Sequence, residues 1–382
     1  MYIHQDGLIT GSAISLMQMI KGFEPNAIDP TVLFFKQGPA VNWFDQEGIK
    51  TIVIKGNAIW TTPGPKWYKL GALINAKAFI RNTKLRTAIA HLKPDIVHVN
   101  DKAALSGGIE ANALDIPIVQ HSRSTYYICN IPLYKYLTAR TINSFASHII
   151  AISEDETMLM NQHKTSVIYN SISLDEINSA IANKVELDKT KLHVGWVGKF
   201  TTAKGAWDFL DLVAKLHEKF PQIQFHMLAK LPSESDVEII NGTQQYTLNF
   251  LNQFIQQNNL TNCLTLQGYR KDFLNVMASL DIIVNCNRLG AFGRQAFETL
   301  ALGVASIATC QKLGKSSVLN SDVALICKEG EKEQLYHATQ TLIQDKNKRL
   351  ALSVAAKKWG NEQFSPIIQS AKVYNIYKQI LP

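Results

Sequence analysis

The chain has 382 residues, of which 46% are apolar, and this length is too great for one hydrophobic core but suits two domains. Only 18% of the residues are charged, which excludes disorder as the main state, and no run of about 18 apolar residues predicts a membrane-spanning helix. The formal charge of +8 does not by itself identify a partner. Five cysteines without close metal-ligand spacing, and a start without a secretory-signal pattern, predict a cytosolic protein with reduced thiols.

Short β-branched runs alternate with helical patterns in the first half, which predicts a parallel sheet built from βαβ units. Strands are expected at residues 32–35, 51–54, 96–99, 118–120, 149–152 and 166–168. Helices are expected at residues 12–21, 71–92, 103–114 and 134–147. Residues 174–188 are polar and lack strong periodicity, so we predict an interdomain linker there.

The same alternation resumes after residue 188. Strands are expected at 192–197, 224–228, 264–268, 282–285, 305–308 and 323–327, with helices at 206–219, 248–258, 273–280 and 294–301. The predicted fold class is α/β, with two doubly wound, Rossmann-like domains facing a central cleft, because ligands of such sheets lie beyond the carboxyl ends of the strands. An aromatic-studded helix is expected over 364–378; periodicity alone leaves open whether it packs on the first domain or caps its own.

A long basic stretch without acidic residues lies between Glu47 and Asp95. Cations with interfacial aromatics suit an anionic bilayer surface, at about 1 kcal/mol per cation. A solvated helix face with inward-packed aromatics fits equally well, whereas no recognition module accompanies the charge, so we expect no nucleic-acid partner. The residues are Lys50, Lys55, Lys66, Lys69, Lys77, Arg81, Lys84, Arg86 and Lys93, with Trp60, Trp67 and Tyr68.

Two lysines follow a predicted buried strand that ends at Gly198. Lys199 and Lys204 lie on the loop before a helix opens at Gly205, where cations at a strand's carboxyl end would clamp a phosphate. The spacing is not the Walker pattern of a P-loop NTPase. Solvated loop lysines are the structural alternative.

A second strand, over 282–285, runs through a glycine-containing turn into a helix that begins near Arg294. The free N–H groups and the dipole at such a helix start suit a diphosphate. Glu298 falls one turn into the helix, where a carboxylate could accept hydrogen bonds from sugar hydroxyls. Its structural alternative is compensation of helix charge.

Taken together, these segments resemble the retaining, GT-B-fold glycosyltransferases of family 4. That family's donor domain reads Gly-Arg/Lys, four residues and Lys-Gly after a strand, and later Glu-x-Phe-Gly-x-x-x-x-Glu-Ala-x-Ala-x-Gly. The first half fits the family pattern at 93–98, 116–121, 150–153 and 167–170, so the resemblance runs from about residue 6 to the end. The matching donor-side positions are Gly198, Lys199, Lys204, Gly205, Gln267, Gly268, Tyr269, Asp272, Asp281, Phe292, Gly293, Glu298, Ala301 and Gly303.

The resemblance implies an acceptor-binding domain over 1–180, a donor-binding domain over 189–360 and a terminal helix over 361–382 that crosses back to the first domain. It implies a nucleotide-sugar donor, a saccharide or lipid-linked acceptor, retention of anomeric configuration and no cofactor or metal. The leaving phosphate oxygen would deprotonate the acceptor on the same face of the sugar. The protein would act in cell-envelope polysaccharide or glycolipid synthesis, in the cytoplasm or at the inner face of the plasma membrane.

The resemblance also assigns roles to single residues. Lys199 and Lys204 would stabilise the leaving diphosphate, and His121 would reach the donor sugar from the end of a first-domain strand. Gly11 would let the first-domain loop approach the diphosphate, and Glu298 would bind the ribose. The donor-binding set is Gly11, Gly198, Tyr269, Gly290, Ala291, Phe292, Gly293, Arg294 and Glu298.

The sequence departs from the family pattern at its first glutamate, where Gly290 stands, and at the preceding Pro-Ser, where Cys286 and Asn287 stand. The change fits a different donor sugar, held by the backbone of 290–292 and by Arg294. It fits equally a non-catalytic relative that binds a nucleotide sugar or supports a partner transferase. A dinucleotide-dependent oxidoreductase is disfavoured, because the GxGxxG motif with its acidic residue about 20 positions later is missing.

Overall fold

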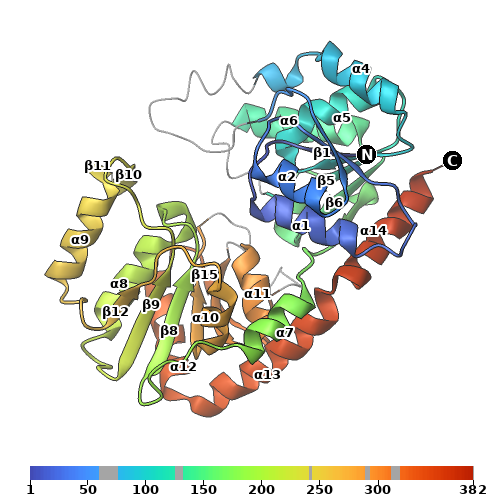
Figure 1. Cartoon of the computed structure of the whole chain (residues 1–382). Coiled ribbons are helices and arrows are strands. Elements are labelled where there is room, and N and C mark those ends of the chain that lie inside the picture. Colours follow the sequence, from blue (N-terminus) through green and yellow to red (C-terminus); the bar gives the residue numbers. More distant parts are fainter. Residues whose placement is uncertain (60–75, 125–131, 241–242, 289–292, 311–318, 382) are drawn as a thin grey trace. The chain divides into compact units, whose positions relative to one another are not determined.

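The computed structural model describes residues 1–59, 76–124, 132–240, 243–288, 293–310 and 319–381 (Figure 1). The chain divides into two compact units, one of Met1–Ser171 with Pro366–Pro382 and one of Ile172–Ser365. Each unit has a parallel sheet flanked by helices, so the predicted α/β class is confirmed.

The sheet of the first unit has seven strands in the order β3-β2-β1-β4-β5-β6-β7, and every pairing is parallel. The strand order reverses between β1 and β4, which makes their carboxyl ends the switch point where doubly wound sheets bind ligands. The strands are β1 (Tyr2–His4), β2 (Thr31–Phe34), β3 (Lys50–Val53), β4 (Val97–Asn100), β5 (Ile118–Ser122), β6 (His148–Ala151) and β7 (Thr165–Val167). The helices are α1 (Gly11–Lys21), α2 (Pro39–Gln46), α4 (Thr83–Leu92), α5 (Leu105–Asn112) and α6 (Pro132–Phe145).

The sheet of the second unit has six parallel strands in the order β12-β9-β8-β13-β14-β15, and its order reverses between β8 and β13. A separate antiparallel hairpin is formed by β10 (Val237–Ile240) and β11 (Thr243–Tyr246). The sheet strands are β8 (Leu192–Val197), β9 (Ile223–Leu228), β12 (Leu264–Leu266), β13 (Ile282–Asn285), β14 (Ala305–Cys310) and β15 (Leu325–Lys328). The helices are α7 (Leu174–Ala182), α8 (Ala206–Leu216), α9 (Thr247–Gln257), α10 (Phe273–Ser279), α11 (Arg294–Leu302), α12 (Lys332–Gln344) and α13 (Lys346–Gln363).

The predicted linker is wrong, because most of residues 174–188 form helix α7. Its apolar stripe is narrow, with Ile177 and Ala180 as its buried residues, and therefore leaves little periodicity in the sequence. The Ser173 side chain caps the helix by accepting from the Glu176 N–H at 3.2 Å, and this Ser-x-x-Glu pattern was the signal available. Residues 172–180, expected in the first domain, belong to the second unit.

The helix predicted over 71–92 is interrupted, and residues 71–75 of it lie outside the described residues. Its described part begins at residue 76 and contains a short 3-10 turn, Lys77–Phe79, before α4 starts at Thr83. Asn82 caps α4 by accepting from the Leu85 N–H at 3.1 Å, which separates the two pieces.

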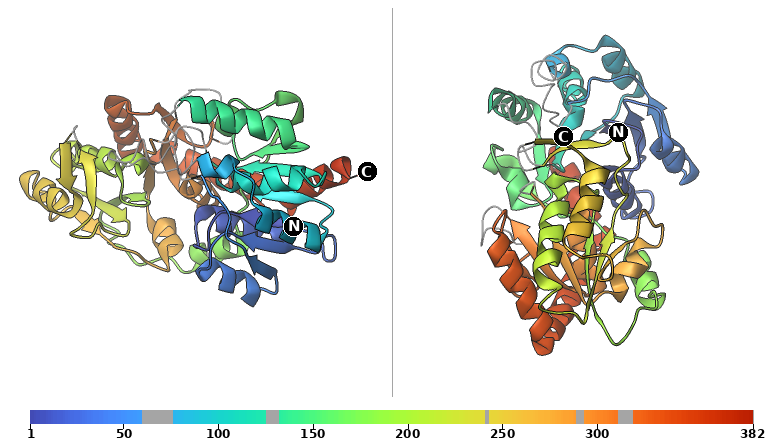
Figure 2. Two further views of the ribbon diagram at one scale, coloured as in Figure 1. Left: turned by 90° about the horizontal axis from the view of Figure 1, so that it is seen from above. Right: turned by 90° about the vertical axis from the view of Figure 1, so that its left-hand side faces the viewer.

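The terminal helix α14 (Pro366–Ile380) belongs to the first unit and packs beside α1, as Figures 1 and 2 show. Val373 and Ile376 are buried in the same core cluster as Leu16 and Met17 of α1. The Ser370 hydroxyl donates to the Met19 carbonyl at 2.7 Å. The first unit is therefore completed by a segment from the far end of the chain.

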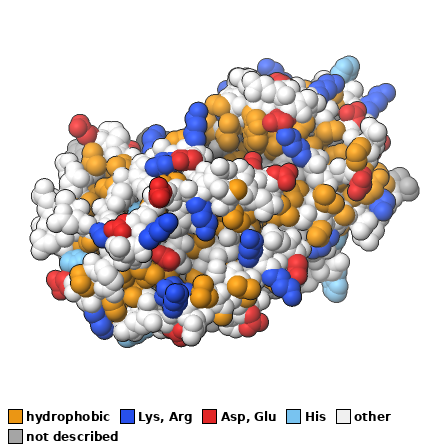
Figure 3. Space-filling model, turned by 60° about the horizontal axis from the view of Figure 1, so that its bottom comes forward, with side chains coloured by type: hydrophobic (Ala, Val, Ile, Leu, Met, Phe, Trp, Pro, Cys, Tyr) orange, Lys and Arg blue, Asp and Glu red, His pale blue; other side chains and the backbone are white. Residues whose placement is uncertain are grey.

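Charged side chains of both signs are interspersed with hydrophobic ones over the face drawn in Figure 3. Within the described ranges, no helix combines the length and the hydropathy needed to cross a bilayer.

We predict that Val373→Ala loosens α14 from the first unit. Val373 is 0% exposed, and removing buried methyl groups without filling the space costs about 2–3 kcal/mol. Hydrogen exchange should accelerate in α1 and α14 together. Ile367→Ala on the same helix is the control, because Ile367 is 64% exposed and the change should cost less than about 0.5 kcal/mol. Equal protection in α1 of the two variants would contradict the packing described here.

Candidate functional site

The two lysine- and glycine-containing segments of the second unit meet at the switch point between β8 and β13. Gly205 has φ +78°, and a Cβ built on it would lie 1.7 Å from the Cys286 carbonyl oxygen. The Cys286 thiol donates to the Gly205 carbonyl at 3.2 Å, and the Arg288 N–H donates to the Ala203 carbonyl at 3.0 Å. The close approach of these segments explains why a glycine occupies position 205.

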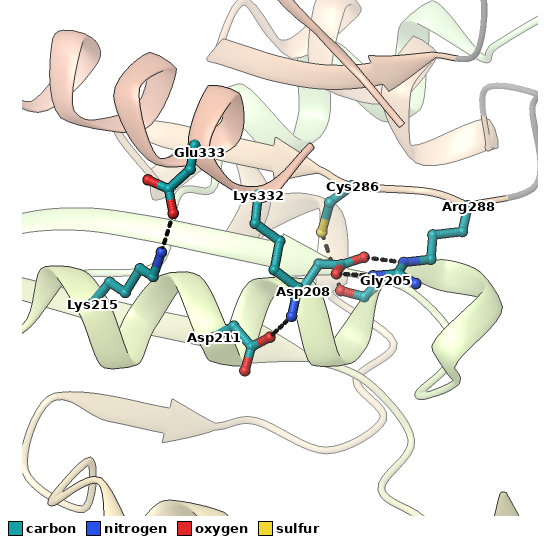
Figure 4. Close-up of polar contacts among 8 residues, drawn as sticks. All are labelled: Gly205, Asp208, Asp211, Lys215, Cys286, Arg288, Lys332 and Glu333. Carbon is teal, nitrogen blue, oxygen red and sulfur yellow. Dashed lines mark hydrogen bonds and ion pairs between the residues drawn. The ribbon is translucent and has the colours of Figure 1, made fainter. Parts of the chain in front are cut away.

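Ion pairs hold helix α8 against the turn after β13 and against α12 (Figure 4). The Arg288 Nε donates to Asp208 Oδ2 at 2.5 Å, and its Nη2 donates to Oδ1 of the same buried carboxylate. Two further pairs, Asp211 with Lys332 and Lys215 with Glu333, join α8 to α12. The guanidinium of Arg288 therefore joins residue 288, just after β13, to helix α8.

Lys204 ends the short 3-10 turn Thr202–Lys204 before α8, and its ammonium group lies near the N-cap of α11. A Cβ built on Gly293, the N-cap of α11, would lie 3.9 Å from Lys204 Nζ. The side chain is partly buried, and this desolvation lowers the pKa of its ammonium group. Among the described residues, Lys204 Nζ has no hydrogen-bond or ion-pair partner. The site thus combines an unpaired cation with the positive end of a helix.

Lys199 occupies a different environment on the same loop. Its side chain is exposed, and it contributes to lowering the pKa of Asp236, after hydrogen bonds from Ser233 and the charge of Lys230. The loop between the two lysines is tethered to the β10–β11 hairpin, because Glu238 Oε2 accepts from the Thr202 N–H at 3.2 Å and from its hydroxyl at 3.1 Å. The hairpin was not predicted from the sequence.

Glu298 is buried within α11, with 4% of its surface exposed. Arg294 Nε donates to Glu298 Oε1 at 2.7 Å, one turn back along the helix. Burial raises the pKa of this carboxyl, and the charge of Arg294 opposes that shift. The structural alternative for Glu298 was a carboxylate that only compensates helix charge at the surface, and the buried, paired Glu298 does not fit that description. Gly290, Ala291 and Phe292 lie outside the described residues.

The remaining predicted donor-side positions lie on loops or at the start of a helix. Tyr269 is 79% exposed, after Gly268 with its φ of +64°. The Gly198 N–H donates to the Leu228 carbonyl at 3.1 Å, and a Cβ there would lie 3.0 Å from the Trp196 ring. In the first unit, Gly11 is the first residue of α1, and a Cβ added to it would meet no described atom within 4 Å. Packing therefore explains a glycine at 198 and leaves the one at 11 without a steric reason inside the protein.

His121 ends up in a buried polar network at the carboxyl ends of β4 and β5. Its Nδ1 lies 3.1 Å from His98 Nε2 and 3.3 Å from Arg123 Nη2, and His98 Nδ1 lies 2.6 Å from the Tyr377 hydroxyl of α14. Burial, followed by the charge of Arg123, holds the pKa of both histidines well below the ordinary value, so both rings are neutral at neutral pH. Among the described residues, His121 Nε2 is buried and has no hydrogen-bond partner.

Arg123 and Asp101 shape the strand ends around His121, and neither was singled out from the sequence. Arg123 donates to Asn100 Oδ1 and Asn170 Oδ1, each at 2.5 Å. Asp101 has φ +86° and ψ 153°, a backbone conformation that residues other than glycine rarely adopt. Its N–H donates to the His121 carbonyl at 2.9 Å. The available signal was the run of polar residues, 98 and 100–101, inside a buried strand end.

The basic stretch is only partly described, because Trp60, Lys66, Trp67, Tyr68 and Lys69 lie outside the described residues. Arg86 forms an ion pair within the first unit, in which its Nε donates to the buried carboxylate of Glu110 at 2.7 Å. An exposed group remains on and before α4, made of Lys77, Ile80, Arg81 and Lys84.

Across the ranges that the structure describes, no three His, Cys, Asp or Glu side chains gather in a way that could hold a metal ion.

Two doubly wound units of this kind define the GT-B glycosyltransferase fold. Structures of HepE from Anabaena are similar to this chain: its UDP complex has a TM-score of 0.76 at 20% identity, covering 99% of both chains. A glycosyltransferase from Rickettsia africae has a TM-score of 0.76 at 18% identity, covering 100% of this chain and 97% of its own. Sucrose-phosphate synthase from Thermosynechococcus elongatus has a TM-score of 0.73 at 16% identity, covering 99% and 98%.

Sequence models of two glycosyltransferase families account for both halves of the chain. The model for Glycosyltransferase Family 4 matches residues 9–176, and that for Glycosyl transferases group 1 matches residues 178–359. The chain therefore belongs to the family 4-like, group 1 glycosyltransferases. No curated protein matches its sequence.

Two glycines test the close approach at this site. Gly205→Ala and Gly268→Ala both place a side chain at a left-handed position, which costs about 1–2 kcal/mol. Only at Gly205 would the new Cβ also collide with a carbonyl oxygen, whereas Gly268 has open space. We expect Gly205→Ala to lower the free energy of unfolding by at least about 2 kcal/mol more than Gly268→Ala. Denaturant unfolding followed by fluorescence of the buried Trp196 and Trp207 measures it; equal losses would contradict the geometry.

Proposed function

We propose that the protein transfers a sugar from a nucleotide-diphosphate donor to a saccharide or lipid-linked acceptor, with retention of configuration and without a metal. The proposal includes a role in cell-envelope polysaccharide or glycolipid synthesis at the cytoplasmic side of the membrane. The observation that carries it is the unpaired ammonium group of Lys204 beside the N-terminus of α11.

The electrostatics of this site favour a diphosphate. A partly buried cation beside the positive end of a helix is unfavourable by itself, because both repel each other in a region with little water. An anion with several oxygens relieves this by accepting from Lys204 and from the free N–H groups of α11. In the transition state the leaving diphosphate gains negative charge, and these donors would stabilise it.

The other predicted residues are proposed to act around that anion. Lys199 would add charge from the loop, and Glu298 would accept hydrogen bonds from the ribose while paired with Arg294. The exposed ring of Tyr269 would face the nucleobase. In the first unit, Gly11 and His121 would approach the diphosphate and the transferred sugar.

The solved relatives supply the best candidate donor. HepE structures were obtained with UDP and with UDP-glucose, and a further similar structure is that of the lipopolysaccharide outer core galactosyltransferase WaaB. These support a UDP-hexose as the first donor to test and a glycolipid acceptor.

Retention is proposed without a protein nucleophile. The leaving phosphate oxygen takes the proton of the acceptor hydroxyl while that hydroxyl attacks the same face of the sugar, so the chain supplies only positioning and charge stabilisation. Such a route tolerates Gly290 in place of the family's first glutamate.

A non-catalytic relative that binds a nucleotide sugar is the second candidate, and Gly290 is the observation that favours it. It requires donor binding without turnover. Purified protein incubated with UDP-, GDP-, ADP- and dTDP-sugars and with lipid-linked or oligosaccharide acceptors separates the two. Transfer with the donor's anomeric configuration, undiminished by EDTA, supports the enzyme. Calorimetric binding without transfer or donor hydrolysis supports the second candidate. If the protein neither binds nor turns over any of these donors, both candidates are refuted.

Replacing Lys204 and replacing Lys199 should lower kcat/KM for the donor by different factors. Lys204→Ala removes a desolvated cation from the proposed diphosphate site, so we expect kcat/KM to fall by about 100-fold or more, as for one charged transition-state contact. Lys199→Ala, which removes an exposed cation, should cost about tenfold or less, because water screens it. Lys219→Ala, which removes an exposed lysine in the turn after α8, is the charge-matched control. Equal kcat/KM for Lys204→Ala and Lys219→Ala would reject the proposed site.

A membrane-facing surface on the first unit is proposed from the exposed group Lys77, Ile80, Arg81 and Lys84. Each cation near an anionic surface contributes about 1 kcal/mol, so reversing Lys77, Arg81 and Lys84 to Glu should weaken vesicle binding at least about 100-fold. Sedimentation with phosphatidylglycerol vesicles measures this. Reversal of the exposed Lys346, Lys348 and Lys357 in the second unit is the matched control, and unchanged binding by the first variant would reject the surface.

A further inference from the structure

We propose that Tyr377 and His98 form a hydrogen-bonded relay that fixes His121 as the tautomer protonated at Nε2. The ring is thereby set to donate a hydrogen bond to a sugar oxygen and is unable to accept a proton from it. Tyr377 and His98 are positioning residues in this proposal. It rests on the proposed function, because it concerns the histidine assigned to the transferred sugar.

The relay lies on one face of the first sheet. Parallel register aligns Tyr2 with His98 and Asn100 with His121, so these side chains point to the same side of neighbouring strands. Helix α14 covers that side, and its Tyr377 is buried there. The contacts are 2.6 Å from the Tyr377 hydroxyl to His98 Nδ1, and 3.1 Å from His98 Nε2 to His121 Nδ1.

Arg123 determines the direction of the relay. A guanidinium can only donate, so His121 Nδ1, 3.3 Å from Arg123 Nη2, must be an acceptor. His98 Nε2 then carries the proton that faces His121, and His98 Nδ1 must accept from the Tyr377 hydroxyl. The alternative partner of that hydroxyl, the Tyr2 oxygen, is farther away at 3.2 Å, which supports this assignment.

The end of the relay is a buried donor without a partner. A neutral histidine carries one proton, so an accepting Nδ1 places that proton on Nε2. Among the described residues, Nε2 is buried and unpaired, an arrangement that costs about 1–3 kcal/mol unless something completes it. A sugar hydroxyl oxygen has the matching chemistry. A base at this position would instead need a free lone pair on Nε2, which Arg123 opposes.

Residues beside the relay provide matched control variants for Tyr377→Phe and His98→Leu. A cavity of about 410 Å³ at the amino ends of the strands is lined by Tyr374, Tyr377 and His98, among others. Tyr374→Phe therefore removes a hydroxyl from the same helix and the same cavity without touching the relay. At His98, glutamine can place an N–H near the position of Nε2, whereas leucine cannot donate.

The test combines histidine ¹⁵N NMR with kinetics of the full-length protein. We expect wild-type His121 to show a protonated Nε2 and a bare Nδ1. Tyr377→Phe should lower the fraction of His121 protonated at Nε2, because Arg123 alone then opposes the other tautomer. His98→Leu should broaden or shift the His121 Nδ1 signal, while Tyr374→Phe and His98→Gln leave the wild-type pattern. His193 and His226 are the internal reference, because Gln267 fixes their tautomers in the other unit, with Gln267 Nε2 3.0 Å from His226 Nδ1.

With the nucleotide-sugar panel, Tyr377→Phe and His98→Leu should lower kcat about tenfold, the factor that one lost neutral hydrogen bond represents, with UDP affinity unchanged. Tyr374→Phe and His98→Gln should retain at least half of the wild-type kcat.

The tautomer is measured without turnover, so two failures remain distinguishable. A protein without transferase activity whose His121 is protonated at Nε2, and is so to a smaller fraction in Tyr377→Phe, retains the relay and loses the proposed function. A wild-type His121 protonated at Nδ1, or a Tyr377→Phe variant indistinguishable from Tyr374→Phe in tautomer, overturns the relay.

Discussion

The proposed function depends on one electrostatic arrangement in the second unit, the ammonium group of Lys204 beside the N-cap of α11. Charges of like sign come together in a folded protein only where something else holds them there. Here the contact of Gly205 with the Cys286 carbonyl fixes the loop that carries Lys204. The Arg288–Asp208 pair joins the residue just after β13 to helix α8. Backbone packing thus keeps the cation in place, which is the preorganisation that the proposed stabilisation of a leaving diphosphate would require.

The first unit differs in that it buries a row of polar side chains on one face of its sheet. The strand Val97–Asn100 alternates apolar and polar residues, and its polar side faces α1 and α14. Burying histidines costs free energy unless their nitrogens are paired, and Tyr377 and Arg123 supply those partners from elements distant in sequence. The terminal helix is therefore part of the polar interior of the first unit as well as of its apolar core.

The comparison of sequence and structure shows where local patterns suffice. Buried parallel strands such as Leu192–Val197 and Ile282–Asn285 were predicted to the residue, because short runs rich in Val, Ile and Trp between polar segments have few alternatives. Helix α7 was missed because packing against α10 and α11 stabilises it more than its own periodicity does. The β10–β11 hairpin was missed although the sequence Asn241-Gly242, a common two-residue hairpin connection, stands between its strands.

For the candidate site, the sequence by itself determined which residue types follow each strand: two lysines after β8, a glycine turn and a glutamate after β13, a histidine on β5. This is possible because the chemistry of a doubly wound fold is confined to the carboxyl ends of its strands. Only the tertiary structure decided which of these groups have partners. It left Lys204 unpaired among the described residues, joined Glu298 to Arg294, and connected His121 to His98, Arg123 and Tyr377. Hydrogen bonds and charge pairs between distant segments depend on distances of a few ångströms that no local pattern encodes.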